Sequence, residues 1–424
     1  MYSTMRLRAT GKETNVRRGT LSSSWLWLLS LFTLAGFIET VFWGQMNSFT
    51  PLYLPRLGIA PGDVATWTGA TVAISGALGI PFLPFWGALA DRYSRKPVIV
   101  RSFVAHLVAG VIALLAGNIW VFVLGRAVMS LALGNSGLMM TTLEERVPEG
   151  RRGLAFSVMN SAPPVGAFIG PLIGGPIVDA RGFPALLAID VALMIGVILM
   201  LTFGYHDDFQ GRNTGPLARM AAESVRVVWE SRRLRTLFPA LFLLFGGWMV
   251  ALTYVPLATQ ALYTGATPGT AVGLVIGAGG LTALVLGPAT GLLADRFGHW
   301  RVLFCGAALE VVLWPLPALM HNIVAFGIAW AVLNGVASGV FALSFSVLSA
   351  SAAAAIRARV LSFAYLPVNA GLFVGPALGS IVTRASLFAV FPVAAALTLL
   401  GVAALAFAAR QPMPQSQAPV AVHV

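Results

Sequence analysis

The chain has 424 residues, of which 58% are hydrophobic and 10% are charged, and its net charge is +12. Ordinary soluble proteins carry roughly 25% charged residues, so this composition excludes a water-soluble domain and indicates a chain that is solvated largely by lipid. The single cysteine, Cys305, excludes an internal disulfide bond.

Apolar runs of about 20 residues, the length that crosses a bilayer, recur along the whole chain. We predict six spans before the middle of the chain, near residues 24–47, 64–86, 98–117, 120–142, 154–178 and 184–204. We predict six more after it, near residues 236–257, 270–293, 302–320, 323–348, 360–382 and 386–409. The sequence therefore predicts an all-α polytopic membrane protein with twelve transmembrane helices.

The polar segments divide the chain into regions. We expect a basic tail (1–23), an N-terminal six-helix bundle (24–204), a linker (205–235), a C-terminal six-helix bundle (236–409) and a second tail (410–424). The linker carries a basic amphipathic piece, which favours a helix lying on the membrane surface.

Nearly all of the 27 Lys and Arg residues lie in the tails and in the loops that share a side with the N-terminus. The exceptions are Arg56, Arg126, Arg181 and Arg384. Because cytoplasmic loops carry the excess of Lys and Arg, this distribution predicts that both termini are cytoplasmic. We interpret the positive charge as a signal of topology, and we expect the lipid bilayer, not nucleic acid, as the partner.

Two polar stretches, from Gly87 to Pro97 and from Gly291 to Arg301, are similar and lie 204 residues apart. Each stands between apolar runs, so each is predicted to be a tight charged hairpin at a water interface. A second pair of motifs has nearly the same offset: Gly166, Gly170, Pro171 and Gly174 are matched by Gly371, Gly375, Pro376 and Gly379. A fixed offset indicates duplication, and therefore two pseudo-symmetric six-helix bundles.

The first hairpin resembles the motif between spans two and three of the major facilitator superfamily, and the resemblance extends over nearly the whole chain. It implies a secondary transporter with a cytoplasmic gate that closes in the outward-facing state. The matching gate residues are Gly87, Asp91, Arg92, Arg95, Lys96, Gly291, Asp295 and Arg296. In the second copy, His299 and Trp300 replace the basic pair.

The physical basis of such a gate is a carboxylate at the membrane edge. Asp91 can meet a helix N-terminus of the opposite half or a nearby arginine, and each such contact is worth about 0.3 to 1 kcal/mol. Several contacts made in one conformation only would bias a two-state equilibrium. The alternative is a pair of solvated loops that obey the charge rule for cytoplasmic loops.

The spacing of Gly166, Gly170 and Gly174 places them on one helix face, and Pro171 removes a backbone hydrogen bond to Ala167. Small faces allow close helix packing in lipid. This run also resembles the span-five motif of the exporting, antiporter branches of the superfamily, and its repeat suggests a symmetric hinge or seam in span eleven.

Ionisable residues inside spans are costly and usually functional. Glu39 lies deep in span one, which lines the central cavity in the superfamily, so we expect it to carry protons; a core glutamate without a transport role is the alternative.

Arg126 lies in a stretch that resembles the arginine-bearing motif of proton-coupled members, although Met129 and Ser130 depart from that motif. A structural arginine bonded to carbonyl groups is the alternative. Weaker candidates are Asp190, Glu310 and His106, because the superfamily places spans six and nine toward the periphery and a structural role suits the histidine in span three.

The topology of the superfamily also predicts a substrate pocket formed by spans one, seven and ten. Its candidate residues are Phe42, Trp43, Gln45, Trp248, Tyr254, Asn334, Phe341 and Phe345. Aromatic walls with few charges suit bulky, amphiphilic or cationic ligands. Individual members of this set can instead face lipid.

The sequence contains no nucleotide-binding loop, no metal-ligand cluster and no Ser-His-Asp arrangement, so we expect neither an enzyme nor a cofactor. We predict a proton-coupled exporter of small amphiphilic compounds, similar to the twelve-span drug:proton antiporters. We expect it to be monomeric and to lie in a bacterial cytoplasmic membrane. The alternatives to an exporter of this kind are a carrier for one specific metabolite and a membrane sensor or scaffold that does not transport.

Overall fold

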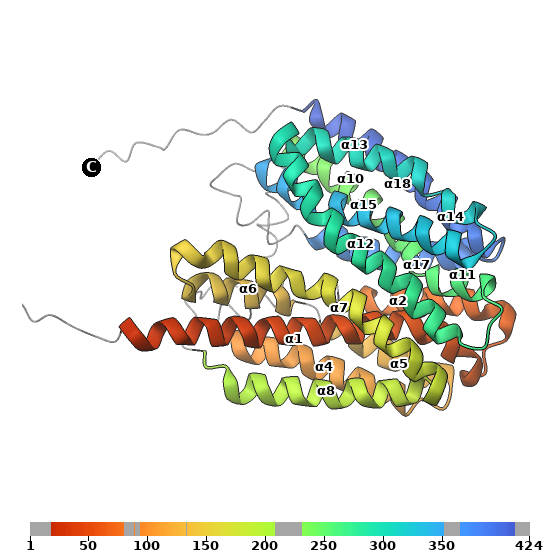
Figure 1. Cartoon of the computed structure of the whole chain (residues 1–424), viewed down its shortest axis with the longest axis horizontal. Coiled ribbons are helices and arrows are strands. Elements are labelled where there is room, and N and C mark those ends of the chain that lie inside the picture. The colour runs from red at the N-terminus through yellow and green to blue at the C-terminus, as the bar shows by residue number, and fades with distance from the viewer. Residues whose placement is uncertain are drawn as a thin grey trace, which may run out of the picture.

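The computed structural model describes residues 18–79, 89, 94–132, 134–207, 231–351 and 365–411, and every regular element in these residues is a helix. The helices form two bundles that lie against each other, one from each half of the sequence (Figure 1).

The N-terminal bundle contains α1 (Arg18–Tyr53), α2 (Val64–Ala77), α4 (Arg95–Leu114), α5 (Ile119–Met129), α6 (Asn135–Arg146), α7 (Arg152–Arg181) and α8 (Phe183–Gly204). The C-terminal bundle contains α10 (Arg232–Leu252), α11 (Val255–Leu262), α12 (Pro268–Phe297), α13 (His299–Leu313), α14 (Leu316–Leu319), α15 (Ile323–Ala350), α17 (Tyr365–Val382) and α18 (Val390–Ala409). Short 3-10 turns occupy Leu54–Leu57, Pro61–Asp63, Ser130–Ala132, Glu149–Arg151 and Leu387–Ala389.

Within the described residues, ten helical segments are long and apolar enough to cross a membrane, and Pro367–Val382 is a shorter apolar helix. The chain is therefore an all-helical, multi-pass membrane protein. The second and eleventh predicted spans, 64–86 and 360–382, extend beyond the described residues, so the number twelve stays a prediction. Most of the predicted linker, residues 208–230, also lies outside the described part of the chain.

Three predicted spans are interrupted within the described residues, which the hydropathy pattern did not indicate. Span nine is divided at Trp314 and Pro315, between α13 and α14. Span four ends its first helix at Met129 and continues in α6 from Asn135, with Gly134 between them at φ +105°. A left-handed backbone of this kind favours glycine, and it lets the chain change direction without a clash at Cβ. Span seven is likewise divided at Thr253 and Tyr254, between α10 and α11.

The second predicted hairpin is much shorter than expected. Helix α12 continues to Phe297, and α13 begins at His299, so the turn consists of Gly298 alone, at φ +94°. Gly291, Asp295 and Arg296 therefore lie in the last turns of α12 and not in a loop. The first predicted span, 24–47, also ends too early, because α1 continues to Tyr53.

The two glycine series place one helix of each bundle directly against its neighbour. A Cβ atom on Gly170 would lie 3.1 Å from the Cα of Val41 in α1, and one on Gly174 would lie 2.8 Å from the ring of Phe49. In the other half, a Cβ on Gly379 would overlap the ring of Tyr254, the position 205 residues after Phe49. The same contact thus recurs at the offset found in the sequence.

The two bundles meet along α7 with α12 and along α2 with α17. A Cβ on Gly273 of α12 would overlap the carbonyl oxygen of Pro171, and one on Gly69 of α2 would overlap that of Pro376. By contrast, a Cβ on Gly291, near the other end of α12, would meet nothing within 4 Å. The closest contacts between the bundles are therefore at the end where α7 stops and α12 starts.

Replacing Gly375 by alanine should destabilise the C-terminal bundle. The new Cβ would lie 2.9 Å from the carbonyl oxygen of Gly246 and 2.9 Å from the Cβ of Met249, and overpacking of this kind costs about 1–3 kcal/mol. We expect a lower melting temperature for the purified protein in detergent. The control is Gly196→Ala on α8, where a Cβ meets nothing within 4 Å and alanine is the better helix former. Equal melting of both variants would contradict the proposed role of the glycine face.

Candidate functional site

One polar cluster inside the N-terminal bundle is centred on Glu39 of α1. One carboxylate oxygen, Oε2, accepts a 2.7 Å hydrogen bond from Nδ2 of Asn135, at the start of α6. The other, Oε1, lies 3.7 Å from Nδ1 of His106 on α4. Three helices of one bundle thus contribute one polar side chain each, and the carboxyl group is largely buried among them.

His106 is oriented by two neighbours. Its Nδ1 lies 3.1 Å from the carbonyl oxygen of Ser102, one turn earlier on α4, so this nitrogen carries the hydrogen in the tautomer that bonds the backbone. The ring of Phe42 packs edge-on against the imidazole at 5.6 Å between ring centroids. The imidazole is therefore fixed next to Glu39, and the ring nitrogen nearest the carboxyl group already donates its hydrogen to the backbone.

Arg126 of α5 lies in a separate polar cluster and is only 1% exposed. Its Nε donates to the carbonyl oxygen of Thr71 at 3.1 Å, and its Nη2 donates to Oδ1 of Asn47 at 2.6 Å and to the hydroxyl of Ser75 at 3.3 Å. These bonds join α5 to α1 and α2. The geometry fits the structural alternative considered for this residue, an arginine bonded to a carbonyl group.

The two residues expected to couple protons are therefore not brought together. Arg126 contacts α1 through Asn47, which follows Glu39 by eight residues, or about 12 Å along the helix axis. Any coupling between the clusters would have to act through α1 itself and not through a direct ion pair.

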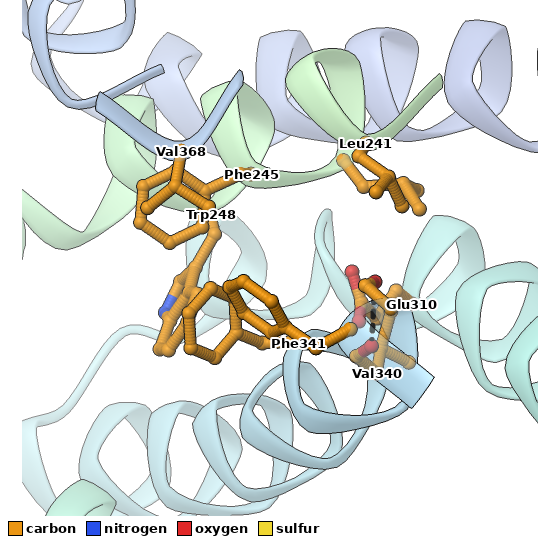
Figure 2. Close-up of a pocket in the computed structure, with 10 residues that line it drawn as sticks. Leu241, Phe245, Trp248, Glu310, Val340, Phe341 and Val368 are labelled. Carbon is orange, nitrogen blue, oxygen red and sulfur yellow. Dashed lines mark hydrogen bonds between the residues drawn. The ribbon is translucent and has the colours of Figure 1, made fainter. Parts of the chain in front are cut away.

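The C-terminal bundle contains an aromatic pocket that is lined from α10, α13, α15 and α17. Figure 2 shows its aromatic side and, to the right of the rings, Glu310. The lining residues are Leu241, Leu244, Phe245, Trp248, Glu310, Val340, Phe341, Ser344, Phe345 and Val368. Only Glu310 of these described residues is ionisable.

The aromatic rings of this pocket contact one another. The centroid of the Phe341 ring lies 5.2 Å from that of Phe245, 5.8 Å from that of Trp248 and 5.0 Å from that of Phe345. The indole Nε1 of Trp248 donates to Oδ1 of Asn334 at 3.0 Å, and Nδ2 of Asn334 donates to the carbonyl oxygen of Gly279. Asn334 thus holds the wall of the pocket in place without lining it.

The remaining pocket candidates lie elsewhere. Phe42 and Trp43 pack within the N-terminal core. Gln45 donates from Nε2 to the carbonyl oxygen of Gly170 at 2.8 Å, which joins α1 to α7. The hydroxyl of Tyr254 donates to the carbonyl oxygen of Pro376 at 3.2 Å. These four residues stabilise contacts between helices and do not line the aromatic pocket.

Glu310 is a weaker candidate than Glu39 by sequence, because span nine is expected at the periphery. That reason does not hold, since its side chain points inward to the pocket and is 1% exposed. Among the described residues, Oε1 of Glu310 has no hydrogen bond of ordinary geometry, although the carboxyl group interacts with the side chain of Trp314, four residues later. Asp190 on α8 is also buried, and its Oδ2 likewise has no partner among them.

Sequence reasoning did not select Asp179, at the end of α7, although it makes the most extensive polar contact between the bundles that we find among the described residues. Its Oδ1 accepts from the backbone N–H of Gly269 at 2.7 Å. Its Oδ2 accepts from the N–H of Thr270 at 2.7 Å and from the hydroxyl of Thr270 at 2.6 Å. A carboxylate of one bundle therefore binds the N-terminus of α12 in the other, where the helix dipole favours negative charge.

Residues 32–269 and 261–422 match the family model described as "Major Facilitator Superfamily". The chain belongs to this superfamily. The match spans both bundles, and it confirms the resemblance that the first hairpin indicated.

Several curated relatives are similar to this chain over most of their own length. The "Multidrug resistance protein MdtG" of Proteus mirabilis is 27% identical over 370 residues, which cover 85% of the chain and 90% of the relative. The protein of the same name from Klebsiella pneumoniae is 26% identical over 408 residues, with 93% and 97% covered. The "Multi-drug resistance efflux pump PmrA homolog" of Lactococcus lactis is 26% identical over 338 residues, with 78% and 82% covered.

Solved structures support the same fold. The nucleoside transporter NupG superposes with a TM-score of 0.70 at 14% identity, covering 91% of the chain and 100% of that structure. The human organic anion transporter MFSD10 superposes with a TM-score of 0.66 at 16% identity, with 90% and 99% covered. At these identities the similarity establishes the arrangement of helices alone.

Only part of the hairpin motif of the superfamily lies in the described residues, because Gly87, Asp91 and Arg92 fall outside them. Arg95 makes a paired contact with Glu145 of α6, in which Nη1 and Nη2 each donate to one carboxylate oxygen at 2.7 Å. The backbone N–H groups of Arg95 and Lys96 donate to Oδ2 of Asp207, at 2.7 and 3.1 Å. Both of these contacts join elements of the N-terminal bundle, and the gate stays a prediction.

Replacing Asp179 by alanine should favour separation of the bundles at this end. The N–H groups of Gly269 and Thr270 would lose their partner, at a cost of about 1–3 kcal/mol, enough to change a two-state population several-fold or more. Nitroxide labels on cysteines at the exposed positions Ala180 and Ala266, in a Cys305→Ser background, would report this as a longer distance by electron–electron resonance.

The control is Asp63→Ala, which removes another carboxylate, exposed on the surface. It should leave the distance distribution unchanged. If Asp179→Ala gives the distribution of the unsubstituted labelled protein, Asp179 contributes nothing to closure at this end.

Proposed function

We propose that this superfamily member is a proton-coupled exporter of small amphiphilic compounds that works by alternating access. Glu39 would take a proton from outside as substrate is released outward, and would release that proton to the cytoplasm when the bundles rock about the membrane midplane. The central observation is the cluster of Glu39, Asn135 and His106 inside the N-terminal bundle.

A carboxyl group at this depth is costly unless it has a function or a partner. The hydrogen bond from Asn135 is compatible with either protonation state of Glu39, because the second carboxyl oxygen can carry the proton. Nδ1 of His106 lies 3.7 Å from that second oxygen, and because this nitrogen donates to the backbone, the imidazole places an N–H group beside the carboxyl group without taking its proton. This arrangement supports a carboxyl group that changes its charge in place.

The relatives support the substrate class. Proteins named for multidrug resistance or multidrug efflux align over most of the chain, in Proteus mirabilis, Klebsiella pneumoniae and Lactococcus lactis. The aromatic pocket agrees with this class, since it offers apolar contact with a single ionisable group among its lining residues.

The contacts between the bundles support alternating access. If both termini are cytoplasmic, as the Lys and Arg distribution predicts, then Asp179 and the N-terminus of α12 lie on the outer side. The bundles are in close contact at that end, whereas a Cβ on Gly291, near the other end of α12, would meet nothing within 4 Å. This arrangement corresponds to a conformation that is closed to the outside.

A carrier for one specific metabolite is the second candidate, and the structural similarity to a nucleoside transporter is compatible with it. The aromatic pocket favours an exporter of amphiphilic compounds over a metabolite carrier. A site for a polar metabolite needs several convergent hydrogen-bonding groups, whereas the residues that line this pocket contribute the polar side chains of Glu310 and Ser344.

Glu39→Gln should abolish substrate-driven proton movement while leaving the fold intact. Purified protein in liposomes with an imposed pH gradient would be given a panel of lipophilic cations and neutral amphiphiles, with proton movement followed by a pH-sensitive dye. We expect flux with the wild type and none with the variant, because glutamine can accept the bond from Asn135 but cannot carry a proton.

The matched control is Glu149→Gln, which neutralises a side chain that is 89% exposed and whose pairing with Arg152 is of the weak surface kind. It should retain full flux. Retained flux in Glu39→Gln would remove Glu39 from the mechanism, and no flux with any compound in the wild type would favour the metabolite carrier or a protein that does not transport.

A further inference from the structure

Helix α4 of the N-terminal bundle and helix α13 of the C-terminal bundle begin at equivalent positions, since Arg95 and His299 differ by 204 residues. At the start of α4, Oδ2 of Asp207 accepts from the backbone N–H groups of Arg95 and Lys96. The same oxygen also accepts from the hydroxyl of Ser94. The N-terminus of α4 thus binds a carboxylate of its own bundle, where the helix dipole favours negative charge.

The start of α13 has no such carboxylate. The residue 204 positions after Asp207 is Gln411, and the residue 204 positions after Glu145, the partner of Arg95, is Ser349. The first backbone N–H of α13 with a partner among the described residues is that of Val302. The N–H groups before it carry the positive end of the helix dipole without an anion from the described part of the chain.

A buried arginine lies beside this helix start. Arg233 of α10 is 7% exposed, and its Nε has no hydrogen-bond partner among the described residues. Its guanidinium carbon lies 4.9 Å from the centroid of the Trp300 ring, in the first turn of α13. The position 205 residues earlier holds Leu28, a residue of the N-terminal core. The charge rule for cytoplasmic loops accounts for exposed arginines, but burying a guanidinium without such a partner is costly and calls for a ligand.

The charge around Arg233 is almost entirely positive. The start of α10, the start of α13 and the end of α18 meet in one apolar cluster through Leu234, Leu303 and Ala408. Exposed arginines surround this end of the bundle: Arg232, Arg235, Arg301 and Arg410. Within residues 231–351 and 365–411, the acidic residues are Glu310, in the aromatic pocket, and Asp295, which is exposed and lies 3.6 Å from the imidazole of His299.

The position of the site at the membrane edge indicates a phospholipid as the source of the anion. If this end is cytoplasmic, as the Lys and Arg distribution predicts, it faces the leaflet whose surface is negatively charged. Phe304 on α13 and Phe407 on α18 are 40% and 57% exposed next to these helix ends, where they can contact acyl chains. A free phosphate ion would gain nothing from such apolar surface.

We propose that the starts of α10 and α13 form a binding site for the phosphate of an anionic phospholipid, with Arg233 as the residue that binds it. The guanidinium donates to phosphate oxygens, and the Trp300 ring holds it in place. The first N–H groups of α13 favour the same negative charge. The lipid takes the part that Asp207 plays in the N-terminal bundle. This inference goes beyond the proposed function, because it requires neither a substrate nor a proton.

The test is native mass spectrometry of the full chain in detergent. The chain is titrated with dioleoyl phosphatidylglycerol, whose headgroup is anionic, or with dioleoyl phosphatidylcholine, whose headgroup has no net charge. We expect Arg233→Gln to raise the dissociation constant of the first bound phosphatidylglycerol about ten-fold or more, because charge-assisted hydrogen bonds are lost. Phosphatidylcholine binding should not change. The matched control is Arg232→Gln, which removes the same charge from the exposed neighbouring residue and should change the constant about two-fold or less.

Trp300→Leu provides a second variant of the same site. It keeps an apolar side chain against the core and removes the ring beside the guanidinium, so it should weaken phosphatidylglycerol binding about three-fold or more. The melting temperature in phosphatidylcholine nanodiscs establishes that each variant is folded. Added phosphatidylglycerol should raise it more in the wild type and in Arg232→Gln than in Arg233→Gln. If Arg233→Gln does not fold, the comparison of Trp300→Leu with Arg232→Gln decides.

Three outcomes would overturn the proposal. If Arg232→Gln weakens phosphatidylglycerol binding as much as the variants of the site do, the arginines act as a diffuse positive surface. If the wild type binds the two lipids equally, the site does not recognise an anion. If inorganic phosphate raises the melting temperature of the wild type as much as phosphatidylglycerol does, the site holds a free anion and not a lipid. The proton flux lost in Glu39→Gln is measured separately, so the proposed function can fail while this site stands.

Discussion

The architecture depends on the close approach of helix backbones along α7. In lipid, apolar side chains gain little by leaving the bilayer for the protein interior, so helices associate through close packing and hydrogen bonds. Gly170 and Gly174 bring one face of α7 onto α1 of the same bundle. On another face, Pro171 and Gly175 meet α12 of the opposite bundle, where Gly273 makes room. One helix therefore carries both the contact that builds a bundle and the contact that joins the two.

These two contacts differ in how easily their hydrogen-bonding groups can be hydrated when the helices separate. The contact with α1 is supported by a buried amide, since Gln45 donates to the carbonyl oxygen of Gly170. The contact with α12 ends in Asp179, a carboxylate at the edge of the bundle that accepts from backbone N–H groups at a helix start. Such groups can be hydrated when they separate, whereas the buried amide cannot. Rigid-body motion of one bundle against the other would then break the second contact and preserve the first.

The sequence predicts the periodic features well, because lipid and close packing leave a strong pattern in it. The runs of apolar residues, the repeat and the glycine faces all follow from spacing along the chain. Hydropathy does not report backbone conformation, so it could not locate the interruption of span four at Gly134. It also does not report rotation about a helix axis, and Glu310 could therefore be assigned to the periphery although its side chain reaches between α10 and α15.

Asp179 could not be found from the sequence for a different reason. Apart from the Thr270 hydroxyl, its partners are the backbone N–H groups of Gly269 and Thr270, about 90 residues away, and a backbone donor leaves no mark in the residue types. Asp179 makes a carboxylate contact with a helix N-terminus of the other half. The contact that the sequence predicts for Asp91 at the cytoplasmic gate stays a prediction, because Asp91 lies outside the described residues.

Duplication supplies two bundles with equivalent central positions, and divergence has given them different chemistry. A group that carries a proton must exist in two charge states, which requires partners that tolerate both, as Asn135 does for Glu39. In the C-terminal bundle the position that corresponds to Asn135 is Val340, whose side chain cannot form a hydrogen bond with the buried carboxyl group of Glu310. A proton on Glu39 and a bound substrate would be coupled because both bias the same equilibrium between conformations.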